Sequence, residues 1–226
     1  TITSTTQVNT TAGFSIVTYT GNGVNGATVG HGLGVAPDMM IVKCLSDSYN
    51  WMVYNSALGP TKAVFLDLTN DDDTDSVYWS NTAPTSGLIS LGTNGKGNAN
   101  TENYVAYCFA EKPGYSKFGE YFGNGSSDGS FVYCGFKPAL IMIKYVSGSG
   151  QSWWMWDDKR IGFNPDQNRL RADQTSAEDS DNVVNLVSNG FKFYSSDNAW
   201  NDGNYIFMAF AENPFVTSDG VPTTAR

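Results

Sequence analysis

Short apolar runs recur along the chain, and each ends at a cluster of glycine, asparagine, serine or aspartate. The runs are rich in β-branched and aromatic residues, a pattern that predicts β-strands joined by tight turns. In the first half the predicted strands are Phe14–Thr20, Ala27–His31, Met39–Cys44, Trp51–Tyr54, Ala63–Leu68, Val77–Trp79, Leu88–Leu91 and Tyr104–Glu111. In the second half they are Ser116–Phe122, Ser130–Tyr133, Leu140–Tyr145, Ser152–Trp156, Asn168–Ala172, Val183–Leu186, Phe191–Tyr194 and Tyr205–Ala211. About seven or eight strands per hundred residues predict an all-β fold of antiparallel, jelly-roll-like β-sandwiches.

The sequence also repeats itself. Residues 103–113 read NYVAYCFAEKP, and residues 204–214, 101 positions later, read NYIFMAFAENP. At the same spacing, PDMMIVK at 37–43 matches PALIMIK at 138–144, and other matches are up to 103 positions apart. The spacing between matched segments changes in this way when turns gain or lose residues, because a strand cannot gain a residue without losing register. The pattern predicts a tandem duplication.

The duplication divides the chain into two β-sandwich modules, residues 13–113 and residues 114–215. The junction Pro113-Gly114 contains no flexible spacer, so we expect the modules to pack together. Residues 1–12 and 216–226 are polar, and we interpret them as a linker cut from a longer polypeptide and as a C-terminal tail.

The repeated strand is apolar on both faces. In its first copy, Tyr104, Ala106 and Cys108 point to one side, and the alternate residues from Val105 to Phe109 point to the other. A strand of this kind is covered on both sides. One side belongs to the sandwich core, and we expect the other to face a close neighbour, either the sister module or another subunit.

Composition narrows the possible partners. The formal net charge is −9 and the isoelectric point about 4.4, which disfavours nucleic acid as a partner. The sequence contains no run of 18 apolar residues, so no membrane-spanning helix is predicted. Cys44, Cys108 and Cys134 are odd in number and lack metal-ligand spacing, so we expect free, packed thiols, typical of a protein made in a reducing cytoplasm.

The sequence contains no local motif for catalysis. His31 is the only histidine and no nucleophile-elbow motif is present, so we interpret His31 as a structural residue and the chain as a non-enzyme. A pair of carboxylates for glycoside hydrolysis stays open, because 22 acidic residues always offer some pair. Carboxylates cluster at Asp71, Asp72, Asp73 and Asp75, where a solvated turn is the favoured interpretation and a calcium site the alternative.

The tryptophans are the better indication of a binding site. Trp51 and Trp154 match at a spacing of 103 and are expected in the core, whereas Trp153 matches Asn50 and is not required by the shared core. Trp200 lies in the polar stretch SSDNAWNDGN. Sugar rings stack on exposed aromatic rings while neighbouring polar groups bind their hydroxyls. The candidate ligand-binding residues are therefore Trp200, Asp197, Asn198, Asn201, Asp202 and Trp153, and the alternative for Trp200 is a buried loop anchor.

The sequence resembles the duplicated C-terminal domains of phage tail-fibre proteins. The phrases that carry the resemblance are HGLGVAPDMMIVK, WMVYNSALGPTKAVFLDLTN, VYWSNTAPTS, NYVAYCFAEKPGYSKFGEYFGNGSSDGSFVYCGFKPALIMIK and GNYIFMAFAENPF, which lie within residues 13–215. The resemblance implies a virion protein of the tail fibre that forms homotrimers and recognises the host. The resemblance assigns a binding role to no residue of this sequence.

Three functions follow from these expectations. The first is an adhesin that binds a bacterial surface glycan or another receptor, with weak sites strengthened by multivalency. The second is a structural virion protein, such as a head fibre, a decoration protein or a fibre spacer. The third is a depolymerase that cuts the glycan, which the lack of a short β-helix repeat disfavours.

Overall fold

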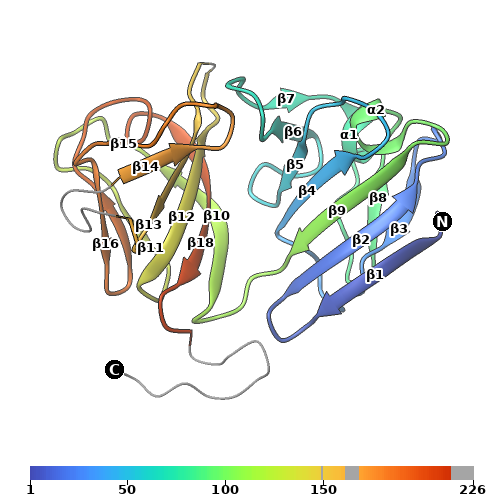
Figure 1. Cartoon of the computed structure of the whole chain (residues 1–226), viewed down its shortest axis with the longest axis horizontal. Helices are drawn as coiled ribbons and strands as arrows, with labels where there is room; N and C mark the ends of the chain where they lie inside the picture. The colour runs from blue at the N-terminus through green and yellow to red at the C-terminus, as the bar shows by residue number, and fades with distance from the viewer. Residues whose placement is uncertain (149, 161–167, 215–226) are drawn as a thin grey trace. The chain divides into compact units, whose positions relative to one another are not determined.

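The computed structural model describes residues 1–148, 150–160 and 168–214. The chain forms two compact units, one made of Thr1–Asp67 and Asp72–Glu111, the other of Leu68–Asp71 and the described residues from Lys112 onward. Antiparallel strand pairing dominates both units (Figure 1), which confirms the all-β class. The second unit starts at Lys112, two residues before the predicted start of the second module.

The first unit contains a seven-stranded sheet and a two-stranded sheet. The large sheet has the order β1 (Ser4–Asn9), β2 (Phe14–Thr20), β9 (Asn103–Phe109), β4 (Met39–Cys44), β5 (Met52–Asn55), β6 (Lys62–Phe65) and β7 (Asp73–Thr74). The small sheet pairs β3 (Ala27–Gly30) with β8 (Leu88–Leu91). Two single-turn helices, α1 (Ser76–Trp79) and α2 (Gly95–Asn98), complete the unit. In β2 the residues that alternate toward the core are buried, among them Val17 and Tyr19.

The second unit contains a six-stranded sheet and a three-stranded sheet among its described residues. The larger has the order β10 (Ser116–Phe122), β18 (Asn204–Ala211), β12 (Pro138–Tyr145), β13 (Trp153–Asp157), β14 (Asn168–Arg171) and β15 (Asp179–Ser180). The smaller has the order β11 (Phe131–Tyr133), β17 (Gly190–Phe193) and β16 (Val184–Val187).

One hydrophobic core joins the two sheets of the second unit. Tyr121 and Phe207 of the larger sheet share this core with Phe191 and Leu186 of the smaller sheet. The ring of Phe191 lies 6.0 Å from that of Tyr121 and 5.5 Å from that of Phe207, both edge to face. Face-to-face packing of two antiparallel sheets around a shared core is the arrangement of a β-sandwich.

The two units share a strand order. The series β2-β9-β4-β5-β6-β7 of the first unit corresponds to β10-β18-β12-β13-β14-β15 of the second. In both, the strand with the repeated letters lies between the first strand of the series and the strand that carries the letters MMIVK or PALIMIK. This correspondence is what a tandem duplication predicts.

Hydrogen bonds correct the alignment of the tryptophans. The backbone N–H of Trp51 donates to the carboxylate of Asp67 at 3.1 Å, and that of Trp153 donates to Asp173 at 2.8 Å. Trp51 and Trp153 therefore occupy the same place, at a spacing of 102. The alignment at 103 was wrong because it followed the letters Trp-Met rather than the strand register.

The corrected alignment changes what each tryptophan is expected to do. Trp153 has a counterpart, Trp51, and not Asn50, while Trp154 corresponds to Met52. Trp153 and Trp154 are buried, whereas Trp51 is only half-buried, so the prediction of a core position holds for Trp154 and fails for Trp51.

Two other predictions differ from the structure. Residues 1–12 are not a linker, because β1 pairs with β2 along its whole length, and residues 216–226 lie outside the described residues. Val77–Trp79 belongs to helix α1 and not to a strand. The carboxylate of Asp75 accepts the N–H of Val77 at 3.0 Å and caps the helix, and Ser80 ends it in a left-handed conformation with φ of 53°.

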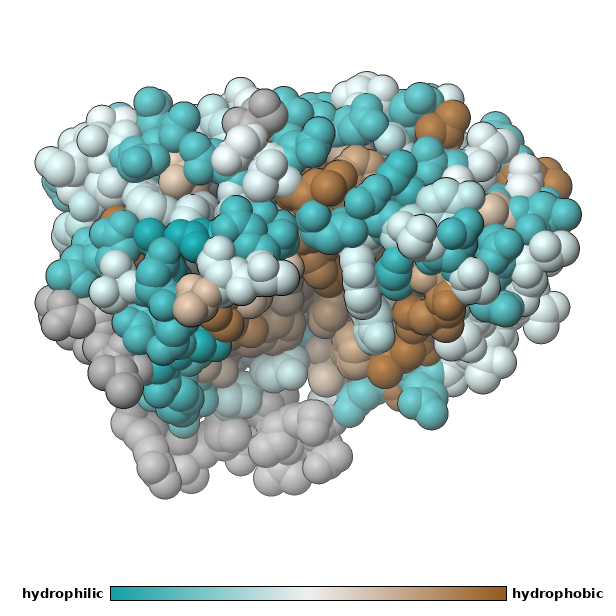
Figure 2. Space-filling model, turned by 45° about the horizontal axis from the view of Figure 1, so that its top comes forward, coloured by the Kyte–Doolittle hydropathy of each residue, from teal (hydrophilic) through white to brown (hydrophobic). Residues whose placement is uncertain are grey.

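Burial confirms the two-sided strand and the packed thiols. Residues Tyr104, Val105 and Ala106 of β9 are consecutive and all buried, so both faces of the strand are covered. All three cysteines are free and buried, and burial raises the pKa of the Cys108 thiol to about 12. Hydrophilic side chains predominate on the face drawn in Figure 2, with apolar side chains among them. Within the described residues, no helix is long and apolar enough to cross a bilayer.

Candidate functional site

The loop predicted to bind a sugar uses its polar groups to hold its own shape. One carboxylate oxygen of Asp197 accepts the N–H of Ala199 at 2.7 Å, and the carbonyl of Asp197 accepts the N–H of Asn201 at 2.8 Å. The side-chain oxygen of Asn198 accepts a hydrogen bond from Gln151 at 2.9 Å. Such a capped turn follows from Asp at its first position. Asp197 and Asn198 therefore already have partners within the unit.

Asn201 is the organising residue of this loop. It is fully buried, its oxygen accepts the N–H of Ser130 at 3.0 Å, and its NH₂ group donates to the carbonyls of Ser126 and Ser195 at 2.9 and 2.7 Å. In the first unit, Asn98 is buried at the corresponding place. A buried side-chain amide whose hydrogen bonds are satisfied holds segments together and is not open to a ligand.

Trp200 and Trp153 are not presented to solvent. The side chain of Trp200 is 5% exposed and that of Trp153 is 1% exposed. The ring of Trp200 packs edge to face on Trp154, with ring centroids 5.0 Å apart. A sugar ring needs an open aromatic face, so the buried-anchor alternative describes Trp200 and the expectation of exposed stacking rings is wrong. Of the predicted residues, Asp197, Asn198 and Asp202 are exposed, and the N–H of Asp202 donates to the hydroxyl of Tyr205 at 2.9 Å.

An arginine packs against both tryptophan rings. The guanidinium carbon of Arg169 is 4.4 Å from the ring centroid of Trp154 and 4.6 Å from that of Trp200. Arg169 also forms ion pairs with Asp179 at 2.7 Å and with Asp181 at 3.0 Å. Burial alone would raise the pKa of Asp179, but hydrogen bonds from Arg169 and a second arginine hold it below its usual range. Two carboxylates and two aromatic rings already contact this guanidinium, and we interpret it as a stabilising element.

The first unit has no tryptophan at the place that corresponds to Trp200. The hydroxyl of Tyr121 donates to the carbonyl of Trp200 at 2.7 Å, and that of Tyr19 donates to the carbonyl of Gly97 at 2.7 Å. Gly97 therefore stands where Trp200 stands. A Cβ added at Gly97 would lie 2.6 Å from the terminal methyl of Met52, so the Met52 side chain would have to move to admit it.

Lys144 is a fully buried cation outside this cluster. Its amine donates to the backbone carbonyl of Gln151 at 2.5 Å. Burial lowers its pKa to about 8, and the nearby carboxylate of Asp173 offsets part of that effect. Because the amine is held by a carbonyl rather than a close ion pair, its charge destabilises the fold.

Lys144 therefore makes stability depend on pH. Relative to Lys144→Met, we expect the free energy of unfolding of the wild-type chain to rise between about pH 8 and 10.5, by up to about 3 kcal/mol. In this window the unfolded lysine still binds a proton that the folded one has lost, so the unfolded state binds more protons and stability rises with pH. Urea unfolding of both chains at each pH measures the difference and cancels the titration of shared groups, such as the buried tyrosines. A difference independent of pH would contradict this assignment.

The acidic cluster forms hydrogen bonds and ion pairs with neighbouring groups. Asp72 pairs with Lys62 at 2.8 Å, Asp73 accepts the hydroxyl of Tyr78, and Asp75 caps helix α1. Among the described residues, no group of three or more potential ligand side chains is placed to hold a metal. The structure therefore offers no support for the calcium alternative.

His31 is a packing residue. It is fully buried, one ring nitrogen lies 3.1 Å from the carbonyl oxygen of Thr85, and the other accepts the N–H of Leu33 at 3.4 Å. Burial lowers its pKa, so the neutral ring is favoured.

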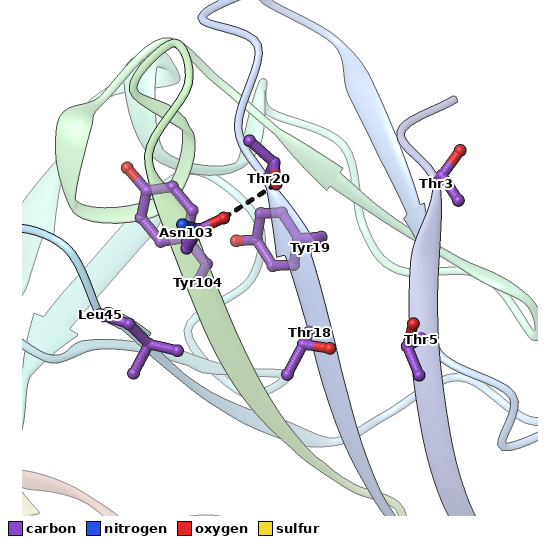
Figure 3. A pocket seen from close by; sticks show the side chains of 8 residues that line it. All are labelled: Thr3, Thr5, Thr18, Tyr19, Thr20, Leu45, Asn103 and Tyr104. Atoms are coloured by element: carbon purple, nitrogen blue, oxygen red, sulfur yellow. Dashed lines mark hydrogen bonds between the residues drawn. The ribbon is translucent and has the colours of Figure 1, made fainter.

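The first unit carries an open groove on the outer surface of its large sheet (Figure 3). Its volume is about 330 Å³, near the lower end of small-ligand sites (~300–1,000 Å³). The residues that line it are Thr3, Thr5, Thr18, Tyr19, Thr20, Leu45, Asn103 and Tyr104. Thr5 and Thr18 are cross-strand partners, so their side chains lie next to each other on one face.

The groove has an uncharged, mixed lining. The hydroxyl of Thr20 donates to the side-chain oxygen of Asn103 at 2.9 Å (Figure 3). This hydrogen bond does not use the NH₂ group of Asn103. Leu45 is 61% exposed and adds an apolar surface. The rings of Tyr19 and Tyr104 stack 5.2 Å apart and are buried, so they support the groove from the core side. With hydroxyls, an amide and methyl groups but no titratable side chain in reach of solvent, the lining suits binding and offers no general acid or base.

This groove was not among the sites predicted from the sequence. Two of its residues, Thr3 and Thr5, lie in the segment interpreted as a linker. The sequence feature that could have indicated the groove is the alternation of threonines, at positions 3 and 5 and again at 18 and 20. Alternate positions of adjacent strands share one face of a sheet.

Fold and groove together define an all-β, sandwich-type domain with a polar surface groove. The chain belongs to the DUF7483 family, described as a domain of unknown function, whose family model matches residues 1–214. No curated protein and no solved structure matches the chain.

Proposed function

We propose that this chain is a non-enzymatic attachment domain of a phage tail fibre that binds a neutral glycan on the bacterial surface. The observation that carries the proposal is the threonine-lined groove of the first unit, in which no residue of the lining is charged although the chain has a net charge of −9. The resemblance to tail-fibre domains supplies the virion setting.

The chemistry of the groove favours a sugar. Each threonine hydroxyl both donates and accepts, and the amide of Asn103 does the same, which matches the hydroxyl groups of a saccharide. The methyl groups of the threonines and the side chain of Leu45 provide apolar contact for the C–H faces of a sugar ring. An anionic glycan would meet the field of a net negative protein without a compensating cation in the groove.

Affinity at such an open site is weak, and a fibre compensates by presenting several copies. If the fibre is a homotrimer, as the resemblance implies, each attachment makes the next one intramolecular and raises the overall strength of binding without new contacts.

The test is a substitution that places a large side chain in the groove. We expect Thr18→Tyr to reduce binding of the purified chain to a panel of immobilised neutral bacterial polysaccharides by about tenfold or more, equivalent to ~1.4 kcal/mol. The matched control is Thr61→Tyr, which places the same ring at an exposed position outside the groove. Binding is read by surface plasmon resonance and by attachment of labelled chain to host and non-host cells.

Three results would overturn the proposal. Equal loss in Thr18→Tyr and Thr61→Tyr would show that the groove is not the site. Equal attachment of the wild-type chain to host and non-host cells, with no glycan bound, would favour the structural virion alternative. Release of soluble sugar from the polysaccharide would reveal an enzyme instead.

A further inference from the structure

The smaller sheet of the second unit carries aromatic side chains on its outer face. Phe131 and Tyr133 are alternate residues of β11, so both point away from the core that Val132 enters. Phe131 is 47% exposed and Tyr133 is 61% exposed. Tyr194, the residue after β17, is 44% exposed. Single exposed apolar residues are common on protein surfaces, but a group of them on one face indicates a site of interaction.

The first unit has no rings at the corresponding positions. Val29 of β3 and Val132 of β11 are buried, and each lies opposite a fully buried residue of the neighbouring strand. The two strands therefore correspond at a spacing of 103. The outward positions on either side of the valine hold Thr28 and Gly30 in the first unit and the two rings in the second. The core that the units share therefore does not account for the rings.

Two glycines bring these rings close to the backbone. A Cβ added at Gly190 would lie 3.2 Å from a ring carbon of Phe131, and one added at Gly135 would lie 3.5 Å from the hydroxyl oxygen of Tyr133. Gly190 is the cross-strand partner of Tyr133, and Gly135 has a φ of 80°, which favours glycine. Each ring therefore lies against backbone that carries no side chain, and the rest of its surface is open to solvent.

Polar groups lie beside the rings. Lys192 is the cross-strand partner of Phe131, and its amine is 5.5 Å from the ring centroid of Tyr194. The carboxylate of Asp128 pairs with this amine at 2.7 Å. Asn185 of β16 is the partner of Lys192 on its other side and adds an amide to the same face. The face thus combines aromatic rings with hydrogen-bonding groups whose charges cancel.

We propose that Phe131, Tyr133 and Tyr194 form a second carbohydrate site, the aromatic platform, which stacks neutral sugar rings. Aromatic rings provide apolar contact for the C–H faces of a sugar, and the neighbouring polar groups pair with its hydroxyls. This inference rests on the proposed function in that the chain binds glycans, but it uses a surface that shares no residue with the groove.

The size and charge of the platform favour a neutral saccharide. A fully covered aromatic side chain buries about 150–250 Å², so three rings that are about half exposed offer on the order of 300 Å². A stable protein partner would cover about 800 Å². The only cation named among these side chains, Lys192, is already paired with Asp128, so it offers little to an anionic ligand.

The test removes one ring from the full chain. The probes are dextran and levan, two neutral bacterial polysaccharides, coupled to a sensor surface. We expect Tyr133→Ala to weaken binding to at least one of them by about fivefold or more, because it removes the most exposed ring of the platform. Tyr133→Phe keeps the ring and should bind within about twofold of the wild type. The control is Leu88→Ala, which truncates an exposed side chain of the first unit.

A second measurement separates binding from packing. The melting temperature of Tyr133→Ala should stay within about 3 °C of the wild type, since exposed side chains contribute little to stability. A lower melting temperature with unchanged binding would show that the ring only covers Gly135, and would overturn the proposal. So would equal losses in Tyr133→Phe and Tyr133→Ala, or a wild-type chain that binds neither probe.

The groove variant keeps the two proposals distinguishable. Combined with Thr18→Tyr, Tyr133→Ala should weaken binding further than either change alone. Loss of binding in Tyr133→Ala but not in Thr18→Tyr would remove the groove and retain the platform. Loss in Thr18→Tyr with wild-type binding by Tyr133→Ala would remove the platform and retain the groove.

Discussion

Replacing Trp200 with alanine is expected to lower the free energy of unfolding by about 3–5 kcal/mol, and the melting temperature by roughly 10–20 °C. Trp200 is buried among Trp154, Trp156 and the guanidinium of Arg169. Removing the indole leaves a large cavity and takes one of the two aromatic faces from a buried cation.

Thermal and urea unfolding followed by circular dichroism measure this effect. The control is Leu45→Ala, which truncates an exposed side chain and should change the unfolding free energy by less than about 0.5 kcal/mol. A melting temperature of Trp200→Ala within about 2 °C of the wild type would contradict the anchoring role and return Trp200 to the list of candidate binding residues.

Replacing Asn201 with alanine is expected to destabilise the chain by at least about 3 kcal/mol. Its side chain is fully buried and holds three separate stretches of the second unit by hydrogen bonds, through Ser126, Ser130 and Ser195. Alanine leaves their backbone groups without these partners, and each unsatisfied buried group costs about 1–3 kcal/mol.

The chain supplies a matched comparison for this prediction. Asn98 is buried in the first unit and donates to the carbonyls of Val24 and Gly92 at 3.0 and 2.8 Å. Asn98→Ala should destabilise the chain by a similar amount. Hydrogen exchange read by mass spectrometry should show the loosening around residue 201 in one variant and around residue 98 in the other. Unchanged exchange near residue 201 would contradict the organising role of Asn201.

Regular strands could be predicted from the sequence because their signal is local. Phe14–Thr20, Met39–Cys44 and Ser116–Phe122 were predicted with the bounds that the structure has. Alternation of apolar residues indicates Phe14–Thr20 and Ser116–Phe122, and a short continuous apolar run indicates Met39–Cys44. The shared strand order of the two units also follows the repeat in the letters.

Predictions from the sequence failed where tertiary contacts outweigh the local sequence pattern. β1 is polar except for Val8, and its place is set by hydrogen bonding to β2 rather than by burial. Val77–Trp79 has the composition of a strand, but the capping carboxylate of Asp75 turns it into a helix. The tryptophan alignment failed because the letters Trp-Met match at a spacing of 103, whereas the strand register pairs Trp51 with Trp153.

The candidate site was the least predictable part. Polar letters around Trp200 suggested exposure, yet Asp197 and Asn201 serve the loop itself and leave the ring inside. The groove is assembled from β1, β2, β9 and the residue after β4, so only the sheet order brings its threonines together.

The tryptophan cluster has a practical consequence for spectroscopy. Of the six indoles in the chain, Trp153, Trp154, Trp156 and Trp200 belong to the second unit, and all four are shielded from water. Intrinsic emission is therefore weighted toward that half, and a blue-shifted spectrum reports its integrity. Following the other half independently requires a different reporter, such as a fluorophore attached at an engineered surface position.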